Sequence, residues 1–198
     1  MNLNFLGDAL DHWKGSIFEQ LQNANVLMGF AVDAMASDGE SWLPDDWELY
    51  AKLLRVQQSQ FIVHDSNLVA DRKSYFNEIG HRGDMFLDPD TGIATSRVNQ
   101  PSQYLMPDEL MDLLSAEKGR IVSVYQHIRA RKARDRLEEV IGVIRLRENP
   151  FACCSYESGT VAMMFFSRSM KRIQAVVRHF HSELGRHASG RITTWSPQ

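Results

Sequence analysis

The feature that most constrains the fold is the alternation of short apolar segments with longer segments whose apolar residues recur at helical spacing. Short apolar runs bounded by turn residues are typical of buried strands. We expect such strands at residues 26–32, 61–63, 85–87 and 121–125. Because parallel strands need a crossover connection between them, strands that alternate with helices predict a mostly parallel sheet.

The segments between the strands carry clear signals of helix formation. Two helices are expected to begin at Pro44-Asp45-Asp46 and Pro107-Asp108-Glu109, since proline fits the first turn and acidic side chains suit the positive end of a helix. The other expected helices cover residues 5–22, 67–80, 129–147 and 170–184. The pattern therefore places helices between successive strands and at both ends of the sheet.

The C-terminal third departs from this alternation. Residues 153–157 and 161–167 are expected to be two strands joined by a tight turn at Ser158-Gly159, which predicts an antiparallel hairpin that adds an edge strand. The fold class that we predict is α/β: three layers, a mostly parallel sheet flanked by helices, and a C-terminal antiparallel hairpin. We expect one α/β domain over residues 1–188 and a flexible C-terminal tail over 189–198.

Composition excludes several classes of protein. A chain of 198 residues with 43% hydrophobic residues is long and apolar enough to bury the core of one domain. No apolar run is long enough to span a membrane, and the opening segment carries Asp8 and Asp11 where a signal peptide would be basic and apolar. The two cysteines, Cys153 and Cys154, are adjacent, which argues against a disulfide framework. We expect a cytoplasmic protein with no membrane partner.

The charges are distributed unevenly along the chain. Residues 1–117 contain 7 basic and 19 acidic side chains, whereas residues 118–198 contain 15 basic and 6 acidic ones. A basic part of this kind is suited to contact with phosphates, so we expect nucleic acid or a nucleotide as a partner. The alternative is that both parts are simply solvated or neutralise each other in the fold.

Polar side chains follow several of the expected strands. Asp33 comes after the first, Asp88 and Asp90 after the third, and Gln126-His127 after the fourth. In open α/β sheets, ligands bind beyond the carboxyl ends of the strands, so one crevice could hold all of these side chains. We expect Asp88 and Asp90 to be catalytic, and His127 to serve as a general acid or base, although a histidine at a strand end is also compatible with a structural role.

A larger acidic set suggests a second interpretation. The set comprises Asp8, Asp11, Asp33, Asp38, Asp88 and Asp90. If these carboxylates converge, they could bind Mg²⁺ and act with Lys14 and His127 as a phosphoesterase or nuclease site. The simpler interpretation of Asp8 and Asp11 is that they stabilise the start of a helix. No spacing is diagnostic of a metal, and we therefore assign no metal ligand.

Two segments, and the chain as a whole, resemble known proteins. Asp-Pro after a strand, within Phe86-Leu87-Asp88-Pro89-Asp90-Thr91-Gly92, resembles the catalytic loop of amino-group methyltransferases. The opening segment from Gly7 to Lys14 is similar to the N-terminal motif of the adenine-N6 methyltransferases that modify large-subunit ribosomal RNA. The chain as a whole resembles a group of small uncharacterised bacterial and phage proteins that share this loop, a Tyr-Gln-His strand end (125–127) and a hairpin with Ser158-Gly159 and Ser167-Arg168.

The resemblance implies a methyltransferase-like Rossmann fold that binds S-adenosylmethionine. It also implies that Asp88 accepts a hydrogen bond from a substrate amine, that Lys14 meets phosphate, and that Asp33, with Asp8 and Asp11, lies at the cofactor end of the crevice. Two departures are visible. The loop at 33–39 has one late glycine where methyltransferases have a glycine-rich loop, and Asp-Pro-Asp-Thr stands in place of Asp-Pro-Pro-aromatic, so the stacking ring is absent from the loop.

The sequence therefore leads to one preferred function and two alternatives. The preferred function is a methyltransferase-like enzyme acting on nucleic acid or a nucleotide, with a cofactor loop that departs from the usual pattern. The first alternative is the Mg²⁺-dependent phosphoesterase or nuclease. The second is a non-catalytic nucleic-acid-binding protein that retains the sheet.

Overall fold

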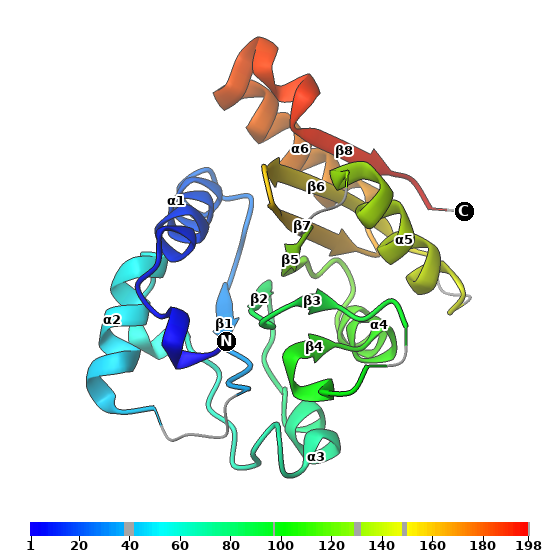
Figure 1. Ribbon diagram of the computed structural model, residues 1–198. Coiled ribbons are helices and arrows are strands. Elements are labelled where there is room, and N and C mark those ends of the chain that lie inside the picture. Colours follow the sequence, from blue (N-terminus) through cyan, green and yellow to red (C-terminus); the bar gives the residue numbers. More distant parts are fainter. Residues whose placement is uncertain (38–41, 97, 129–131, 148–149, 198) are drawn as a thin grey trace.

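A computed structural model describes residues 1–37, 42–96, 98–128, 132–147 and 150–197 of the chain. Its centre is a six-stranded sheet in the order β1-β2-β5-β7-β6-β8, with a separate pair β3-β4 (Figure 1). The six strands are β1 (Ala31–Asp33), β2 (Met85–Leu87), β5 (Val122–His127), β6 (Ala152–Ser158), β7 (Val161–Ser167) and β8 (Ile192–Trp195). The small pair consists of β3 (Gly92–Ile93) and β4 (Tyr104–Leu105), which are parallel.

The sheet is mixed. Strands β1, β2 and β5 are parallel, with Val32 opposite Phe86 and Phe86 opposite Ser123. From β5 onward, β7, β6 and β8 are antiparallel to their neighbours. The expectation of a mostly parallel sheet is therefore corrected to a sheet whose first half is parallel and whose second half is antiparallel. The hairpin itself was expected. The balance changes because residues 61–63 form no strand and because β8 adds a further antiparallel pairing.

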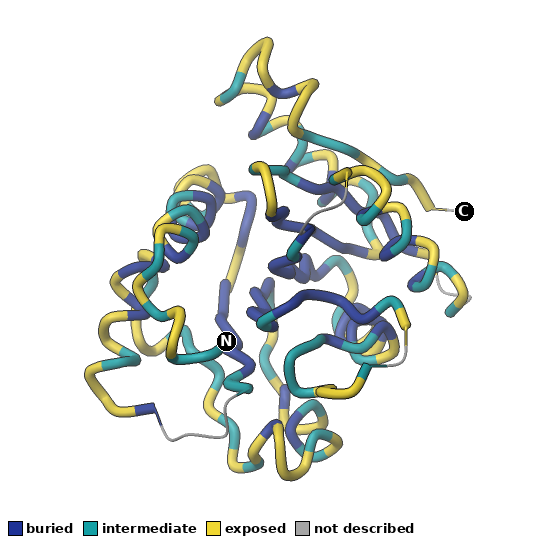
Figure 2. The backbone as a smooth tube through the Cα atoms, viewed as in Figure 1, coloured by how far each residue is buried: buried dark blue, intermediate teal, exposed yellow. Residues whose placement is uncertain are grey.

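Helices cover both faces of the sheet, which gives three layers (Figure 1). The helices α1 (Ala9–Asn23), α2 (Pro44–Leu54) and α6 (Met170–Leu184) pack on one face, and α3 (Arg72–Asn77), α4 (Pro107–Ala116) and α5 (Ala133–Arg145) pack on the other. Short 3-10 helices are η1 (Leu3–Phe5), η2 (Gln58–Gln60), η3 (Pro101–Gln103) and η4 (Gly185–Gly190). The inner strands β1, β2, β5 and β7 are buried apart from the end of β5, the edge strand β8 is half-exposed, and exposed residues lie on the outer helix faces and in loops (Figure 2). The predicted α/β class with helices on both faces of a sheet is confirmed.

The starts of the helices follow the signals in the sequence. Pro44 and Pro107 begin α2 and α4, and the carboxylates of Asp46 and Glu109 accept hydrogen bonds from the backbone N–H of residues 43 and 106. Asp8 is the N-cap of α1, where its Oδ1 accepts from the N–H groups of Leu10 and Asp11. Each carboxylate thereby satisfies backbone donors that a helix leaves unpaired at its start.

Three expected segments differ in the structure. The apolar run 26–32 forms a strand only from Ala31, because the N–H groups of Val26 and Leu27 instead bond to the carbonyl of Leu21 and close the end of α1. Residues 61–63 form a single bridge, Phe61 to Val32, and not a strand. Of the helix expected at 67–80, only Arg72–Asn77 is α-helical. The residues 129–131 at the start of the helix expected over 129–147 lie outside the described residues, and α5 ends at Arg145.

The end of the chain also differs from expectation. Part of the tail predicted at 189–198 is strand β8, which pairs with β6 through Cys153–Trp195 and Tyr156–Ile192. Strand β8 therefore forms the edge of the sheet, and the 152–167 hairpin that we expected at the edge lies inside it. Among the described helices, none has the length and apolar character required to cross a membrane.

Candidate functional site

The carboxyl ends of the parallel strands bring the predicted residues to one edge of the sheet. Asp33 ends β1, Asp88 follows β2, and His127 ends β5. The backbone N–H of Asp88 donates to the carbonyl of Asp33 over 3.0 Å, so the two strand ends are directly adjacent. The main geometric expectation from the sequence, that these acids gather at a common edge, agrees with this arrangement.

Asp88 is a buried carboxylate with two donors on one oxygen. Its Oδ2 accepts from the Nζ of Lys14 over 2.7 Å and from the hydroxyl of Tyr50 in a short contact. Asp88 is 1% exposed, and its Oδ1 accepts no hydrogen bond from the described residues. This leaves one carboxylate oxygen as an acceptor for a ligand.

Lys14 links α1 to the strand ends. Its Nζ lies 3.1 Å from Oδ1 of Asp11 and 4.5 Å from the centre of the Tyr125 ring, in addition to its contact with Asp88. Burial works against the charged ammonium, but the attraction of Asp88 and Asp11 outweighs it and raises the pKa of Lys14. The structure thus corrects the expectation that Lys14 meets phosphate: it is 3% exposed and its charge is taken up by two carboxylates.

Asp8 and Asp11 have mainly local partners on the same helix. Asp8 caps α1, as described above, and Oδ2 of Asp11 accepts from the N–H of Gly7 over 2.9 Å. Burial raises the pKa of Asp11, and the Lys14 charge opposes that rise. Both residues lie beside the Asp88 pocket, and neither lines the larger cavity next to Asp33. The expected placement of Asp8 and Asp11 at the cofactor end with Asp33 is therefore corrected: they lie on the Asp88 side.

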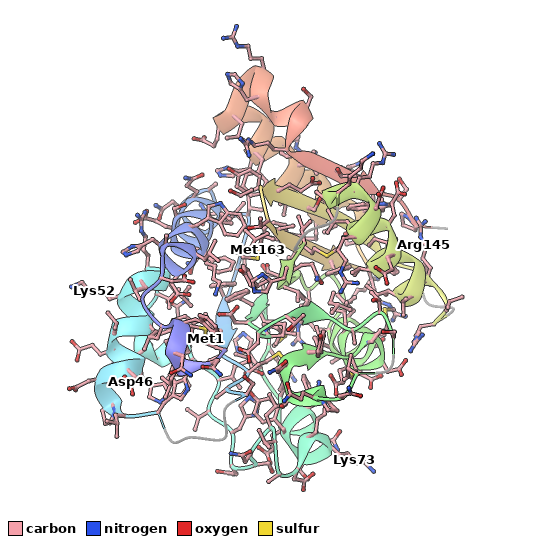
Figure 3. All side chains as sticks on the ribbon, viewed as in Figure 1. Met1, Asp46, Lys52, Lys73, Arg145 and Met163 are labelled. Atoms are coloured by element: carbon pink, nitrogen blue, oxygen red, sulfur yellow. The ribbon has the colours of Figure 1, made fainter. Side chains whose placement is uncertain are left out.

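Asp90 lies in the same region, where it forms an ion pair with the α-amine of Met1. One of its oxygens lies 3.2 Å from the α-amine of Met1, and the other accepts from the hydroxyl of Ser37 in a short contact. The amine of Met1 also donates to the carbonyls of Ala34, Met35 and Asp88 over 2.7–2.8 Å. Met1 lies beside the end of β1 (Figure 3), and burial lowers the pKa of its amine.

A small cavity at this edge surrounds Asp88 and has a volume of about 210 Å³. The acidic residues that line it are Asp8, Asp11, Asp88 and Asp90. Its lining also includes Lys14, Tyr125, His127 and Phe5. His127 also lines a separate hollow of about 230 Å³ with Thr91, Arg136 and other polar residues. His127 therefore stands between the Asp88 cavity and a more polar surface.

A larger cavity lies beside Asp33 and has a volume of about 540 Å³. Oδ1 of Asp33 accepts from the N–H of Met35 over 2.9 Å and from the hydroxyl of Tyr75 in a short contact. His64 stacks on Tyr75 with ring centres 3.6 Å apart, and its Nε2 lies 3.3 Å from Oδ2 of Asp33. Trp47 and Phe61 complete an aromatic wall.

The polar atoms that face this larger cavity are incompletely paired. Oδ2 of Asp33 and both ring nitrogens of His64 are buried without a hydrogen bond in the described part of the chain, because the 3.3 Å approach of Oδ2 and Nε2 is poorly aligned. Leaving buried polar groups unpaired costs about 1–3 kcal/mol each. An arrangement of this kind indicates a ligand or water that supplies the missing partners.

The acidic residues are not arranged as a metal centre in the described part of the chain. Within residues 1–37, 42–96, 98–128, 132–147 and 150–197, no three His, Cys, Asp or Glu side chains are placed to hold a metal ion together. Asp38, which belongs to the acidic set predicted from the sequence, lies outside the described residues. The carboxylates of Asp11 and Asp88 are instead neutralised by Lys14.

Several residues of the site were not found from the sequence. Tyr50 and Tyr75 reach the strand ends from helices on opposite faces, and their hydroxyls contact Asp88 and Asp33. Tyr50 lies in the helix that was predicted to begin at Pro44, but no pattern in the sequence marked it as part of a site. His64 did carry a signal, because it follows an apolar segment that was predicted to be a strand. Gln126 was predicted at a strand end, but its role in bonding Ile93 N–H (2.8 Å) and so fixing β3 was not.

Comparison with known proteins adds little. No protein-family model matches the chain. No curated protein matches its sequence. One solved structure that is similar is protein LPL1258 from Legionella pneumophila strain Philadelphia 1, described under the family model DUF519, with 13% identity and a TM-score of 0.43. The match covers 79% of this chain and 58% of that chain, so it spans less than two thirds of the other protein.

Proposed function

We propose that this chain is a methyltransferase-like enzyme that uses S-adenosylmethionine to modify an amino group of a nucleic acid or nucleotide. The observation that carries the proposal is the pair of adjacent cavities at the strand-end edge, one bordered by Asp33 and the other by Asp88. A transfer reaction needs two binding sites that meet, and the Asp88 N–H to Asp33 carbonyl bond makes them neighbours. The resemblance of the 86–92 loop and the Gly7–Lys14 segment supports the same assignment.

The larger cavity fits the chemistry of this cofactor. About 540 Å³ lies within the usual range of small-molecule sites. Its aromatic wall suits a planar base, and the unpaired Oδ2 of Asp33 and ring nitrogens of His64 suit hydroxyl groups or a positive charge. S-adenosylmethionine, when bound, supplies an electrophilic methyl group. The loop after β1 lacks the glycine-rich pattern, but Met35 adopts a φ of 45°, a left-handed conformation of the kind that glycine provides elsewhere.

The smaller cavity fits the substrate side of the proposal. Oδ1 of Asp88 is the acceptor that would bind the amine, and the contacts of Lys14 and Tyr50 with Oδ2 hold the carboxylate in place. Lys14 forms an ion pair with Asp88, and an ionised carboxylate acts as an acceptor only. Lys14 and Tyr50 are therefore positioning residues in this proposal, and Asp88 is the residue that touches the substrate.

The phosphoesterase alternative is favoured by no contact in the described residues. The carboxylates that it requires are directed to Lys14, Tyr50, Ser37 and the Met1 amine. One result would distinguish the phosphoesterase from the methyltransferase. Mg²⁺ would raise the melting temperature of the parent protein, and Asp88→Asn would abolish that rise.

The test of the proposal is calorimetric titration of the folded protein with S-adenosylmethionine. We expect binding in the parent and weaker binding in Asp33→Asn, by roughly tenfold to a hundredfold, because a hydrogen bond to a charged group is worth about 1.5–3 kcal/mol. Asp112→Asn, which changes an exposed acid on α4, is the matched control and should bind like the parent. Absence of heat at millimolar ligand in a folded parent would exclude the proposal and leave the non-catalytic binding protein.

A further inference from the structure

An exposed aromatic ring stands at the wall of the Asp88 cavity. Phe5 is 62% exposed, yet it lines the same cavity of about 210 Å³ as Asp88 and Tyr125. Isolated exposed apolar side chains are common and need no explanation. Phe5 differs from such a case because it lines a cavity together with Asp88, whose Oδ1 has no donor among the described residues.

Hydrogen bonds fix the backbone around Phe5, so the point from which its side chain projects is defined. Oδ1 of Asn2 caps η1 by accepting from the N–H of Asn4 over 2.9 Å, and the N–H of Phe5 donates to the carbonyl of Asn2 over 3.0 Å. The carbonyl of Phe5 in turn accepts from the N–H of Asp8, the N-cap of α1. Phe5 is thus tied to the helix that carries Lys14 and, through Lys14, to Asp88.

The charge of the cavity restricts what can enter it. Four carboxylates line it, those of Asp8, Asp11, Asp88 and Asp90. The two amines among its lining groups, those of Lys14 and the Met1 terminus, balance at most half of that charge. An excess of negative charge repels phosphate and other anions, and it accepts neutral or cationic groups. A nucleotide would therefore place its base, and not its phosphate, in this cavity.

A second aromatic ring in the cavity is already used. Tyr125 is 4% exposed, and the Nζ of Lys14 lies over its ring at 4.5 Å. His127 also lines the cavity and is only partly exposed, so Phe5 is the most exposed of its three aromatic rings.

We infer that Phe5 is the stacking residue for a neutral planar ring that bears an amino group, and that this ring presents its amine to Oδ1 of Asp88. The inference rests on the proposed function for the identity of the site and adds the residue that selects a flat heteroaromatic amine. Stacking of a base on an aromatic side chain stabilises binding by about 1–3 kcal/mol, so Phe5 is a specificity-determining residue of appreciable weight.

The experiment measures binding of free nucleosides by calorimetry. Adenosine and cytidine carry an exocyclic amine on the base, whereas inosine and uridine do not. We expect the parent to prefer the first pair. Phe5→Leu, which keeps an apolar side chain and removes the aromatic face, should weaken cytidine and adenosine binding by about fivefold to a hundredfold. Phe5→Trp should retain parental affinity, and Leu146→Ala, an exposed apolar side chain after α5, should have no effect.

The outcomes separate this inference from the proposed function. Parental affinity in Phe5→Leu, or no nucleoside binding by the parent, overturns the inference; if S-adenosylmethionine still binds, the proposed function stands. Loss of nucleoside binding in Phe5→Leu, with retention in Phe5→Trp, supports the inference even if S-adenosylmethionine does not bind. Because Phe5 is mostly exposed, thermal unfolding should be nearly unchanged in both variants, which distinguishes loss of stacking from loss of structure.

Discussion

At the scale of single residues, Lys14 compensates the negative charge of two buried carboxylates in the site. It is buried between Asp11 and Asp88, and removing one partner of a buried charge pair leaves the other charge uncompensated. We expect Lys14→Gln to lower the free energy of unfolding by about 3–5 kcal/mol. Lys52→Gln, on the outer side of α2 (Figure 3), is the control and should change it little. Urea denaturation measures both. Equal midpoints for the two variants would show that the Lys14 pair contributes no stability.

The same group of residues predicts how stability depends on pH. Burial, and then the charge of Asp88, raises the pKa of Tyr50 above that of a free tyrosine, and the pKa of Lys14 is raised as well. A raised folded-state pKa gives stability that is complete below the unfolded value, about 10 for tyrosine and 10.4 for lysine, and is lost as pH rises through the folded value. Stability should therefore fall above about pH 10.

Tyr50→Phe tests the tyrosine part of this dependence. Because phenylalanine cannot ionise, the alkaline fall in the free energy of unfolding should be less steep in the variant than in the parent. Urea titrations at a series of alkaline pH values give these slopes. Identical slopes in the parent and Tyr50→Phe would contradict the assignment.

The residue scale also shows how far the sequence predicts the site. Asp33, Asp88 and His127 could be placed at one edge because each follows an apolar segment, and that signal is local. Their partners could not be predicted in the same way. Lys14 reaches Asp88 from a position 74 residues earlier, and Tyr75 reaches Asp33 from 42 residues later. Such pairings depend on how helices pack on the two faces of the sheet, which no short pattern encodes.

At the scale of elements, the close packing of α1 on α2 depends on one glycine. A Cβ at Gly15 would lie 2.0 Å from the carbonyl oxygen of Leu53, so alanine would force the two helices apart. We expect Gly15→Ala to destabilise the protein by about 1–3 kcal/mol or more. Gly142 lies in α5 with no atom close to its Cβ position, and Gly142→Ala should stabilise by about 0.5–1 kcal/mol. Thermal or urea unfolding compares the pair directly. The same sign of change in both variants would rule out the close contact.

Elements differ in how well the sequence predicts them, and the reason is physical. Helices that begin with proline and an acid start where predicted, because the signal acts on the local backbone. Short strands are harder to predict from the sequence. Phe61 makes only one bridge, since an apolar segment can be buried without a ladder of hydrogen bonds. Strand β8 was missed although Ile192, Thr193 and Thr194 are β-branched, because a four-residue strand at a chain end gains its stability from pairing with β6.

At the scale of the whole molecule, the α/β class followed from the alternation of strands and helices, but the sheet order did not. Two antiparallel strands inserted after β5 place the 152–167 hairpin inside the sheet, and nothing in the local sequence distinguishes an inner hairpin from an edge hairpin. The acidic and basic side chains are also divided between the N-terminal and C-terminal parts of the fold. The acidic N-terminal part forms β1, β2 and α1 to α4, and the basic C-terminal part forms α5, α6 and β6 to β8 (Figure 1).

This division of charge predicts where the proposed nucleic-acid partner would make its phosphate contacts. Lys132 and Arg134 are exposed at the start of α5, and the Arg134–Glu138 pair is too exposed to hold the arginine strongly. If phosphates bind here, the affinity for a single-stranded oligonucleotide should fall with salt. Lys132→Glu with Arg134→Glu should then reduce the slope of log K against log salt by roughly 0.7 for each phosphate that the protein no longer neutralises. Fluorescence anisotropy across a salt series measures this slope.

The control for that measurement makes the same change in net charge on the acidic N-terminal part of the molecule. Lys52→Glu with Lys73→Glu alters two exposed lysines on α2 and α3 (Figure 3), and it should leave the slope at the parental value. If both double variants reduce binding alike, the effect comes from net charge and not from a basic surface on α5. If neither changes the slope, phosphates bind elsewhere. Only a reduction confined to the α5 variant places the backbone of the nucleic acid on the C-terminal side, beyond the acidic cavity that repels it.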